Sequence, residues 1–214
     1  MPAPIRLAII VGSTRPGRVG PAVAEWFAGR VRRLPGVDVD LVDLADIALP
    51  FLDEPEHPAL GRYTRPHTLA WSQRIAPAEA FVLVTPEYNA SFPAPLKNAL
   101  DTIYDEWSGK PVGFVGYGGQ VGGARAVSAL RPVVCALGML PVGMDVNVHR
   151  VGRMLGEDGT LEATCDLDDR ADLLVTELIA FTTMLRSRRP AEPITDRDEQ
   201  TDSPVDSVAL ASES

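Results

Sequence analysis

The chain has few of the residues that most often bind metals or form disulfides. Its 214 residues include two cysteines, Cys135 and Cys165, and three histidines, His57, His67 and His149. None of them forms a CxxC pair or stands at the spacing of a zinc site. We therefore predict no metal site, and we expect both cysteines to be packed as small apolar groups, as free cysteines usually are.

Long hydrophobic runs and an excess of positive charge are also missing. The longest apolar runs, such as Leu7 to Val11, have the length of a buried strand, whereas a membrane span needs roughly 20 residues. The first residues, Met1 to Arg6, lack the basic-then-apolar pattern of a secretory signal. The formal net charge is −9, and proteins that neutralise nucleic-acid phosphates need a basic face. We expect a cytoplasmic protein that binds neither membrane nor nucleic acid.

Apolar, β-rich segments alternate with helical ones along most of the chain. Strands are predicted at residues 5–11, 37–44, 80–85, 111–116 and 140–148, and helices at residues 21–34, 66–75, 93–104, 123–137 and 166–186. This alternation is typical of a parallel sheet with helices on both faces. The expected fold is a doubly wound, five-stranded parallel α/β sheet in the order 2-1-3-4-5, because right-handed crossovers leave few alternatives.

The composition changes after Arg186. Seven acidic and three basic side chains follow that residue, with little apolar surface to bury. Such a segment cannot offset the entropy that ordering it would remove. We predict one folded domain at residues 1–186 and a disordered acidic tail at residues 187–214.

The loop after the first predicted strand reads GSTRPGRVG and has the features of a phosphate site. It opens a helix, whose first N–H groups attract anions. Ser13 and Thr14 add hydroxyl donors, and Arg15 and Arg18 can bind phosphate through paired hydrogen bonds. The loop lacks the Gly-Lys-Ser/Thr of a nucleoside-triphosphate P-loop and the GxGxxG of a dinucleotide turn. The alternative is a turn with solvated arginines.

The loop after the third predicted strand reads TPEYNASFPAPLKNALD from residue 85 to residue 101. Three prolines stiffen its beginning and set the start of the next helix. Glu87 and Asn89 offer polar atoms to the rim of a planar ligand, and Tyr88 offers a flat apolar surface. A proline-braced turn with an incidental tyrosine explains these residues equally well.

The loop after the fourth predicted strand is rich in glycine. It reads GYGGQVGGAR, with five glycines within eight residues. Glycine allows the backbone to approach a ligand closely because it has no Cβ. The segment therefore indicates either a backbone contact with a ligand or a flexible turn before a helix.

The stretches GSTRPGR and TPEYNASFPAPLKNALD resemble the signatures of the NADPH-dependent FMN reductase family, which includes flavin, quinone, azo-dye and chromate reductases. The resemblance covers residues 5–185 and implies a flavodoxin-like fold that binds FMN. In that family, the phosphate is held by the residues at the positions of Ser13, Thr14, Arg15, Arg18 and Val19. The isoalloxazine ring is lined by those at the positions of Pro86, Glu87, Tyr88 and Asn89.

The glycine-rich loop of such reductases touches the pyrimidine side of the flavin. The matching positions here are Gly118, Gly119 and Gln120. Family members often carry a serine near the start of this loop, where the present sequence has Tyr117 and Gly118. This departure affects the detailed contacts of the loop and leaves the expected fold unchanged.

The resemblance implies an enzyme in which NADPH or NADH passes hydride to N5 of FMN, and an acceptor then takes the electrons in a ping-pong cycle. No side chain needs to be a nucleophile or an acid, so no catalytic residue is named. The acceptor is a small molecule: free flavin, a quinone, an azo compound or a metal oxyanion. The alternatives are a non-enzymatic electron carrier of the flavodoxin type and a redox-inactive binding module.

The resemblance also implies a homodimer or homotetramer. Related proteins associate through the helix that corresponds to residues 96–104. Leu96, Leu100 and Ile103 could pack against a partner, or they could face the sheet of their own chain.

Overall fold

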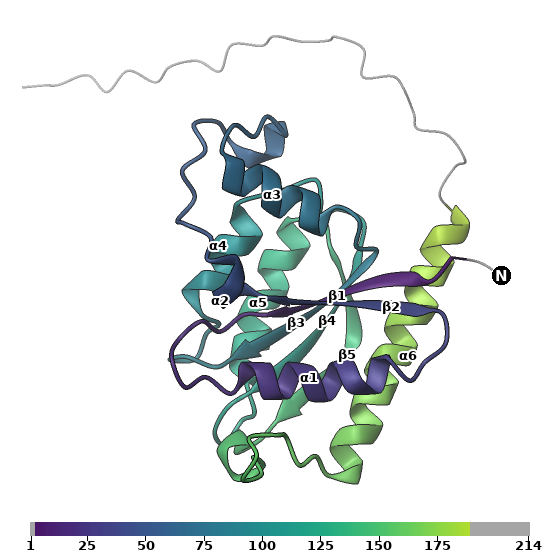
Figure 1. The fold of residues 1–214 in the computed structure, drawn as a ribbon. Helices are drawn as coiled ribbons and strands as arrows, with labels where there is room; N and C mark the ends of the chain where they lie inside the picture. The colour runs from purple at the N-terminus through teal and green to yellow at the C-terminus, as the bar shows by residue number, and fades with distance from the viewer. Residues whose placement is uncertain (1–2, 189–214) are drawn as a thin grey trace, which may run out of the picture.

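The structure is a computed structural model that describes residues 3–188 (Figure 1). Five parallel strands form one sheet in the order β2-β1-β3-β4-β5. The strands are β1 (Ile5–Val11), β2 (Val37–Asp43), β3 (Ala80–Pro86), β4 (Pro111–Tyr117) and β5 (Leu140–Val148). The predicted fold class and strand order are confirmed, and each predicted strand lies within two residues of its observed bounds.

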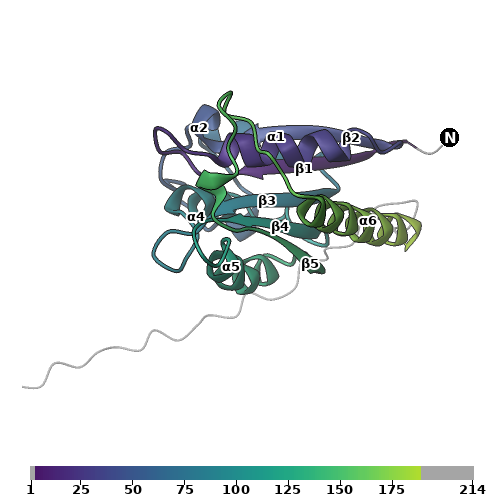
Figure 2. The ribbon, with the colours of Figure 1, turned by 90° about the horizontal axis from the view of Figure 1, so that it is seen from below.

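Helices cover both faces of the sheet. One face carries α1 (Gly20–Val31) and α6 (Cys165–Arg188), and the other carries α3 (Pro66–Ile75), α4 (Ala94–Asp101) and α5 (Ala124–Ala136). Figure 2 shows α1 lying along β1 and α6 along β4 and β5. The short helix α2 (Leu44–Ile47) and two 3₁₀ turns, η1 (Pro58–Leu60) and η2 (Val151–Arg153), lie in the connections.

The central strands are buried because helices cover them on both sides. Every residue of β3 and of β4 is buried, which accounts for their nearly continuous apolar sequence. The edge strand β2 alternates aspartate with apolar residues and is mostly half-buried. The amino-acid pattern of each strand thus follows its position in the sheet.

Two tryptophans anchor the core under α3, α4 and α5. The Trp71 ring packs against Trp107 with 6.2 Å between centroids, and Trp107 lies 4.9 Å from the Phe81 ring. Leu96 and Leu100 on α4 are fully buried in the same cluster. Burying a side chain of this size stabilises the fold by about 1.5–3 kcal/mol. The apolar side of α4 therefore faces the sheet, and so does Ile103, which is fully buried there.

Two helices end earlier than predicted. Helix α1 ends at Val31, so Leu34 lies beyond it and is 36% exposed. Helix α4 ends at Asp101, and Thr102 follows as its C-cap, with its N–H bonded to the Asn98 carbonyl. Pro35 and Gly36 follow Leu34 and favour a later end for the first helix, whereas neither glycine nor proline follows Asp101 closely.

The expectation that both cysteines are packed inside is wrong. Cys135 and Cys165 are free and exposed, because Cys135 lies on the outer side of α5 and Cys165 begins α6. Helix α6 also continues to Arg188, two residues past the predicted end of the domain. The rest of the predicted tail, residues 189–214, lies outside the described residues, and the division of the chain into domain and tail stays a prediction.

Candidate functional site

The loops after β1, β3 and β4 meet at the carboxyl edge of the sheet. The chain leaves β1 toward the face of α1 and leaves β3 toward the face of α4, so a crevice opens between the two loops. A cavity of about 150 Å³ lies there, and it is lined by Arg15, Arg18, Val19, Pro86, Glu87, Tyr88, Tyr117, Gly118 and Val151. Seven of the twelve residues that the sequence selects as binding residues thus line one cavity.

The loop after β1 keeps most of its polar groups available. Its backbone is anchored at Gly12, whose N–H donates to the Val84 carbonyl at 2.9 Å. Thr14 and Arg15 are exposed, and Arg15 donates one long bond of 3.4 Å to the carbonyl of its neighbour Pro16. Ser13 is fully buried beneath the loop. The guanidinium of Arg15 is therefore free to turn toward an anion.

Arg18 has a carboxylate partner that sequence reasoning missed. Its Nη1 and Nη2 atoms contact Asp43 Oδ1 and Oδ2 at 2.9 and 2.8 Å, and both side chains are less than one-fifth exposed. Asp43 also accepts a hydrogen bond from the Ala45 N–H and so caps α2. This pair fixes Arg18 at the cavity wall, with part of its positive charge already balanced.

A tight turn holds Tyr88 at the end of β3. The backbones of Tyr88 and Ser91 exchange hydrogen bonds of 2.8 and 3.0 Å. Between them, Asn89 and Ala90 both have positive φ, at 50° and 66°. Asparagine tolerates this conformation, whereas for alanine it costs about 1–2 kcal/mol. The turn is kept despite this strain, as is common where a loop must present a side chain to a ligand.

Glu87 ties the loop after β3 to the start of α5. Its Oε1 accepts from Arg125 Nε at 2.7 Å and its Oε2 from the Arg125 N–H at 3.2 Å. The side chain is 10% exposed, and the Glu87 N–H donates to the Tyr117 carbonyl. The Glu87 carboxylate and its backbone N–H thus both have partners within the protein, which the sequence did not reveal.

Two glycines, Gly116 at the end of β4 and Gly123 in the loop that follows, are required by close packing. Gly123 has a φ of 86°, and a Cβ there would lie 2.7 Å from the backbone of Gly116. Gly116 would meet the Gly123 carbonyl oxygen at 3.0 Å. The loop therefore folds back tightly over the end of β4. Gly119 differs, because a Cβ there would meet nothing within 4 Å.

The segment after β5 holds the glycine-rich loop by hydrogen bonds to its carbonyl groups. The N–H groups of Arg150 and Val151 donate to the carbonyls of Gly119 and Gly118 at 2.7 and 3.1 Å. His149 Nδ1 lies 2.8 Å from the Gln120 carbonyl oxygen. No local pattern in the sequence marks this segment as part of the site, because its contacts are made only through the neighbouring strand.

The residues present fit an FMN phosphate. The cavity wall carries two arginines, the loop before α1 carries exposed donors, and the paired Glu87 leaves little uncompensated negative charge. The volume is below the roughly 300 Å³ at which whole-ligand pockets begin. The cavity therefore suits the phosphate end of FMN better than the whole cofactor.

Residues 5–152 match the sequence family described as NADPH-dependent FMN reductase. The chain belongs to this family. It is similar to an NAD(P)H-dependent FMN reductase of Schizosaccharomyces pombe, with 45% identity over 136 residues that cover 63% of this chain and 68% of the relative. It is also similar to an FMN-dependent NADPH-azoreductase of Staphylococcus haemolyticus, with 33% identity over 81% of this chain and 93% of the relative.

A solved structure with the same fold is that of FerB, an NAD(P)H:acceptor flavoenzyme of Paracoccus denitrificans. It covers 86% of this chain and 98% of its own, with a TM-score of 0.59 and 23% identity, and so supports the fold alone. The family assignment confirms the predicted enzyme class, an NAD(P)H-dependent FMN reductase, and its cofactors, FMN with NAD(P)H. The non-enzymatic alternatives are not supported. The individual binding residues stay predictions.

Tyr117 lines the cavity of this reductase, and its burial determines its protonation state. Removal from water raises the pKa of Tyr117 to about 12, although its hydrogen bond with Ser13 and the positive charges of Arg18 and Arg15 act in the opposite direction. The phenol is therefore neutral and keeps its proton at physiological pH.

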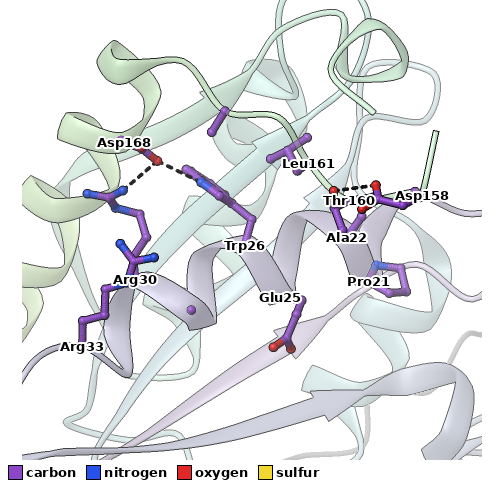
Figure 3. Close-up of a pocket in the computed structure, with 13 residues that line it drawn as sticks. Pro21, Ala22, Glu25, Trp26, Arg30, Arg33, Asp158, Thr160, Leu161 and Asp168 are labelled. Atoms are coloured by element: carbon purple, nitrogen blue, oxygen red, sulfur yellow. Dashed lines mark hydrogen bonds and ion pairs between the residues drawn. The ribbon is translucent and has the colours of Figure 1, made fainter. Parts of the chain in front are cut away.

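A larger hollow of about 670 Å³ lies elsewhere on the reductase, between the outer side of α1 and residues 158–168 (Figure 3). Trp26 Nε1 donates to Asp168 at 3.0 Å, and Arg30 contacts Asp168 at 2.8 Å and Asp172 at 2.5 Å. None of the predicted binding residues lines it. These contacts join α1 to α6.

Within residues 3–188, no helix is long and apolar enough to cross a membrane. The same residues contain no group of three or more His, Cys, Asp or Glu side chains placed to hold a metal ion.

Proposed function

We propose that the three loops hold FMN with its phosphate on the loop after β1 and its ring over the loops after β3 and β4. The observation that carries this proposal is the convergence of Arg15, Arg18, Tyr88 and Gly118 on one cavity at the carboxyl edge of the sheet. A flavin held there supplies the redox chemistry, because it accepts a hydride from NAD(P)H and passes electrons on. The protein binds and orients it.

Each loop has a separate task in this proposal. Arg15 and the Thr14 hydroxyl bind the phosphate, together with Arg18 and the backbone at Val19, and the fully buried Ser13 holds the loop from beneath. Pro86, Glu87, Tyr88 and Asn89 line the ring. The backbone of Gly118, Gly119 and Gln120 contacts its pyrimidine side, where N–H donors stabilise negative charge on the reduced ring.

The experiment is an absorbance titration of the purified protein with FMN, followed by anaerobic addition of NADPH and, separately, of NADH. A bound flavin band that bleaches supports the proposal. Binding without bleaching by either nucleotide contradicts the reductase activity. If FMN does not bind, the assignment of the loops is wrong.

We further propose a planar conjugated acceptor, such as a quinone or an azo compound. The part of the cavity nearest the expected ring is formed by Pro86, Tyr88 and Val151, which offer apolar and aromatic surface. A metal oxyanion would instead need the arginines that the phosphate occupies. Steady-state rates of NADPH oxidation with 1,4-benzoquinone, an azo dye, free FMN and chromate rank the candidates. The highest rate with chromate would contradict the proposal.

We also propose that the reductase forms a homodimer or homotetramer through the outer side of α4 and α5. A groove of about 540 Å³ there is lined by Leu52, His57, Pro58, Lys97, Asp101, Tyr104, Pro132, Val133, Ala136 and Leu137. Phe51 and Leu60, in the connection between α2 and α3, are 81% and 55% exposed. Exposed apolar surface of this kind is typical of an interface.

Sedimentation velocity of two matched variants tests this association. Leu52 in the groove and Leu69 on α3 are almost equally exposed, at 41% and 42%. We expect Leu52→Asp to lower the mass of the assembly and Leu69→Asp to leave it unchanged. A monomeric wild-type protein would contradict the proposal. A cytoplasmic location, which fits two free cysteines, stays a prediction.

A further inference from the structure

A buried hydrogen bond joins two of the three loops. The Tyr117 hydroxyl at the end of β4 donates to Ser13 Oγ after β1 at 2.9 Å, across 104 residues of sequence. The side chain of Tyr117 reaches past β3, which lies between the two strands. Tyr117 is 4% exposed and Ser13 fully buried, so this bond is shielded from water and stronger than it would be at the surface.

The start of α1 lies directly against this hydroxyl pair. A Cβ at Gly20, the first residue of α1, would lie 2.7 Å from Tyr117 Oη and would also overlap Ser13 Oγ. Glycine at this position therefore allows the N-terminus of α1 to approach both hydroxyls. The pair stands where the N–H groups of α1 and the side chains of the phosphate loop meet.

The chemistry of the two hydroxyls determines which of them donates. A phenol is the more acidic hydroxyl and the better donor, whereas an aliphatic hydroxyl oxygen is the better acceptor. Tyr117 therefore donates its hydroxyl proton to Ser13 Oγ. This bond fixes Ser13, and with it the start of the loop after β1, against the end of β4.

We infer that Tyr117 is a positioning residue for the FMN phosphate. Its hydroxyl holds the buried Ser13, and this bond keeps the loop after β1 in the position from which the exposed Thr14 and Arg15 face the phosphate. This inference rests on the proposed binding of FMN at this site. It assigns Tyr117 a role toward the phosphate and not toward the ring.

The test compares FMN with riboflavin, which has the same ring and no phosphate. Dissociation constants of both are measured by quenching of flavin fluorescence in wild type, Tyr117→Phe, Ser13→Ala and the double variant. We expect Tyr117→Phe to weaken FMN binding about threefold to tenfold, the effect of one lost hydrogen bond. Riboflavin affinity stays the same. In the Ser13→Ala background, Tyr117→Phe has no further effect on FMN.

A matched control is Tyr63→Phe, which removes another half-buried hydroxyl, bonded to Glu106 at 3.0 Å and outside the cavity. It leaves the affinity for both flavins unchanged. Gly20→Ala is a second variant that does not alter the hydroxyls themselves. Because its Cβ would displace the pair, we expect it to weaken FMN binding and to spare riboflavin.

Equal losses for FMN and riboflavin would overturn the inference, because they would show that Tyr117 acts only through packing. Additive effects of Ser13→Ala and Tyr117→Phe would also overturn it. If Tyr117→Phe does not fold, the ratio of FMN to riboflavin affinity is measured in Gly20→Ala instead. An unchanged ratio in that variant would overturn the inference. A wild-type protein that binds neither flavin would instead contradict the proposed function itself.

Discussion

The loops after β1 and β4 line the same cavity and are built in opposite ways. The loop after β1 leaves Thr14 and Arg15 exposed, and few of its side chains are engaged within the protein. In the loop after β4, successive carbonyls are engaged by residues 149–151, and Gly123 packs against the backbone of Gly116. The first loop offers charged and hydroxyl side chains to a ligand, whereas the glycines of the second offer only backbone groups.

The largest effect is expected from filling the packed part of the glycine-rich loop. Gly123→Ala places a Cβ at a φ of 86° and against the Gly116 backbone, so we expect a loss of about 3 kcal/mol or more in the free energy of unfolding. Gly119→Ala meets open space and should change stability by less than about 1 kcal/mol. Urea unfolding measures both.

Similar losses for the two glycine variants would contradict the division of this loop into a packed part and an open part. Flavin binding by Gly119→Ala also tests how this loop differs from the loop after β1. Gly119→Ala should weaken binding of FMN and riboflavin alike, because both present the same ring.

The next effect concerns the charge of the loop after β1. Arg15→Ala removes a charge-assisted contact worth about 1.5–3 kcal/mol, and we expect FMN binding to weaken roughly tenfold to hundredfold. Stability should stay unchanged because Arg15 is exposed. Arg33→Ala, which removes an exposed arginine at the end of α1, is the control for net charge. An unchanged FMN dissociation constant in Arg15→Ala would rule out this phosphate contact.

The bond that joins the two loops should be sensitive to alkali. Burial raises the pKa of Tyr117 to about 12, above the usual value near 10. The stability that depends on the neutral phenol is therefore fully present below pH 10 and is lost as the pH rises through 12. Relative to Tyr117→Phe, the wild type should lose about 2 kcal/mol over this window. Unfolding curves that stay parallel from pH 9 to pH 12 would show that the phenol is not buried.

The smallest effect is expected from the ion pair that links the loop after β3 to α5. Arg125 is 62% exposed and Glu87 10% exposed, so Arg125→Ala should lower the free energy of unfolding by about 0.5–1 kcal/mol. The control is Arg170→Ala, whose pair with Asp166 is 50% and 81% exposed and should contribute almost nothing. Equal effects would mean that the Glu87 pair is only a surface contact.

Sequence reasoning located the strands well because helix-covered strands have a strong apolar pattern. It was less accurate at helix ends, because Pro35 and Gly36 lie beyond the end of α1 and neither glycine nor proline follows α4 closely. It also failed for Cys135 and Cys165, because the side of a helix on which a small residue falls depends on how the helix packs.

The candidate site also contains parts that the sequence predicted and a part that it did not. The loops at Gly12, Pro86 and Gly118 were visible in the sequence because glycine, proline and arginine gather at the ends of strands. The 3₁₀ turn at Val151 was not, because its contribution to the cavity comes only from its position beside β4.

The sequence by itself determined the order of strands and helices, the family and the three loops that form the candidate site. These depend on local patterns, in which the period of apolar residues and the turn residues act over a few positions. Only the tertiary structure decided which side chains pair. Arg18 with Asp43, Glu87 with Arg125 and Ser13 with Tyr117 are separated by 25, 38 and 104 residues. Such pairs form because the strand order 2-1-3-4-5 brings the ends of distant strands to one edge, and no local pattern records it.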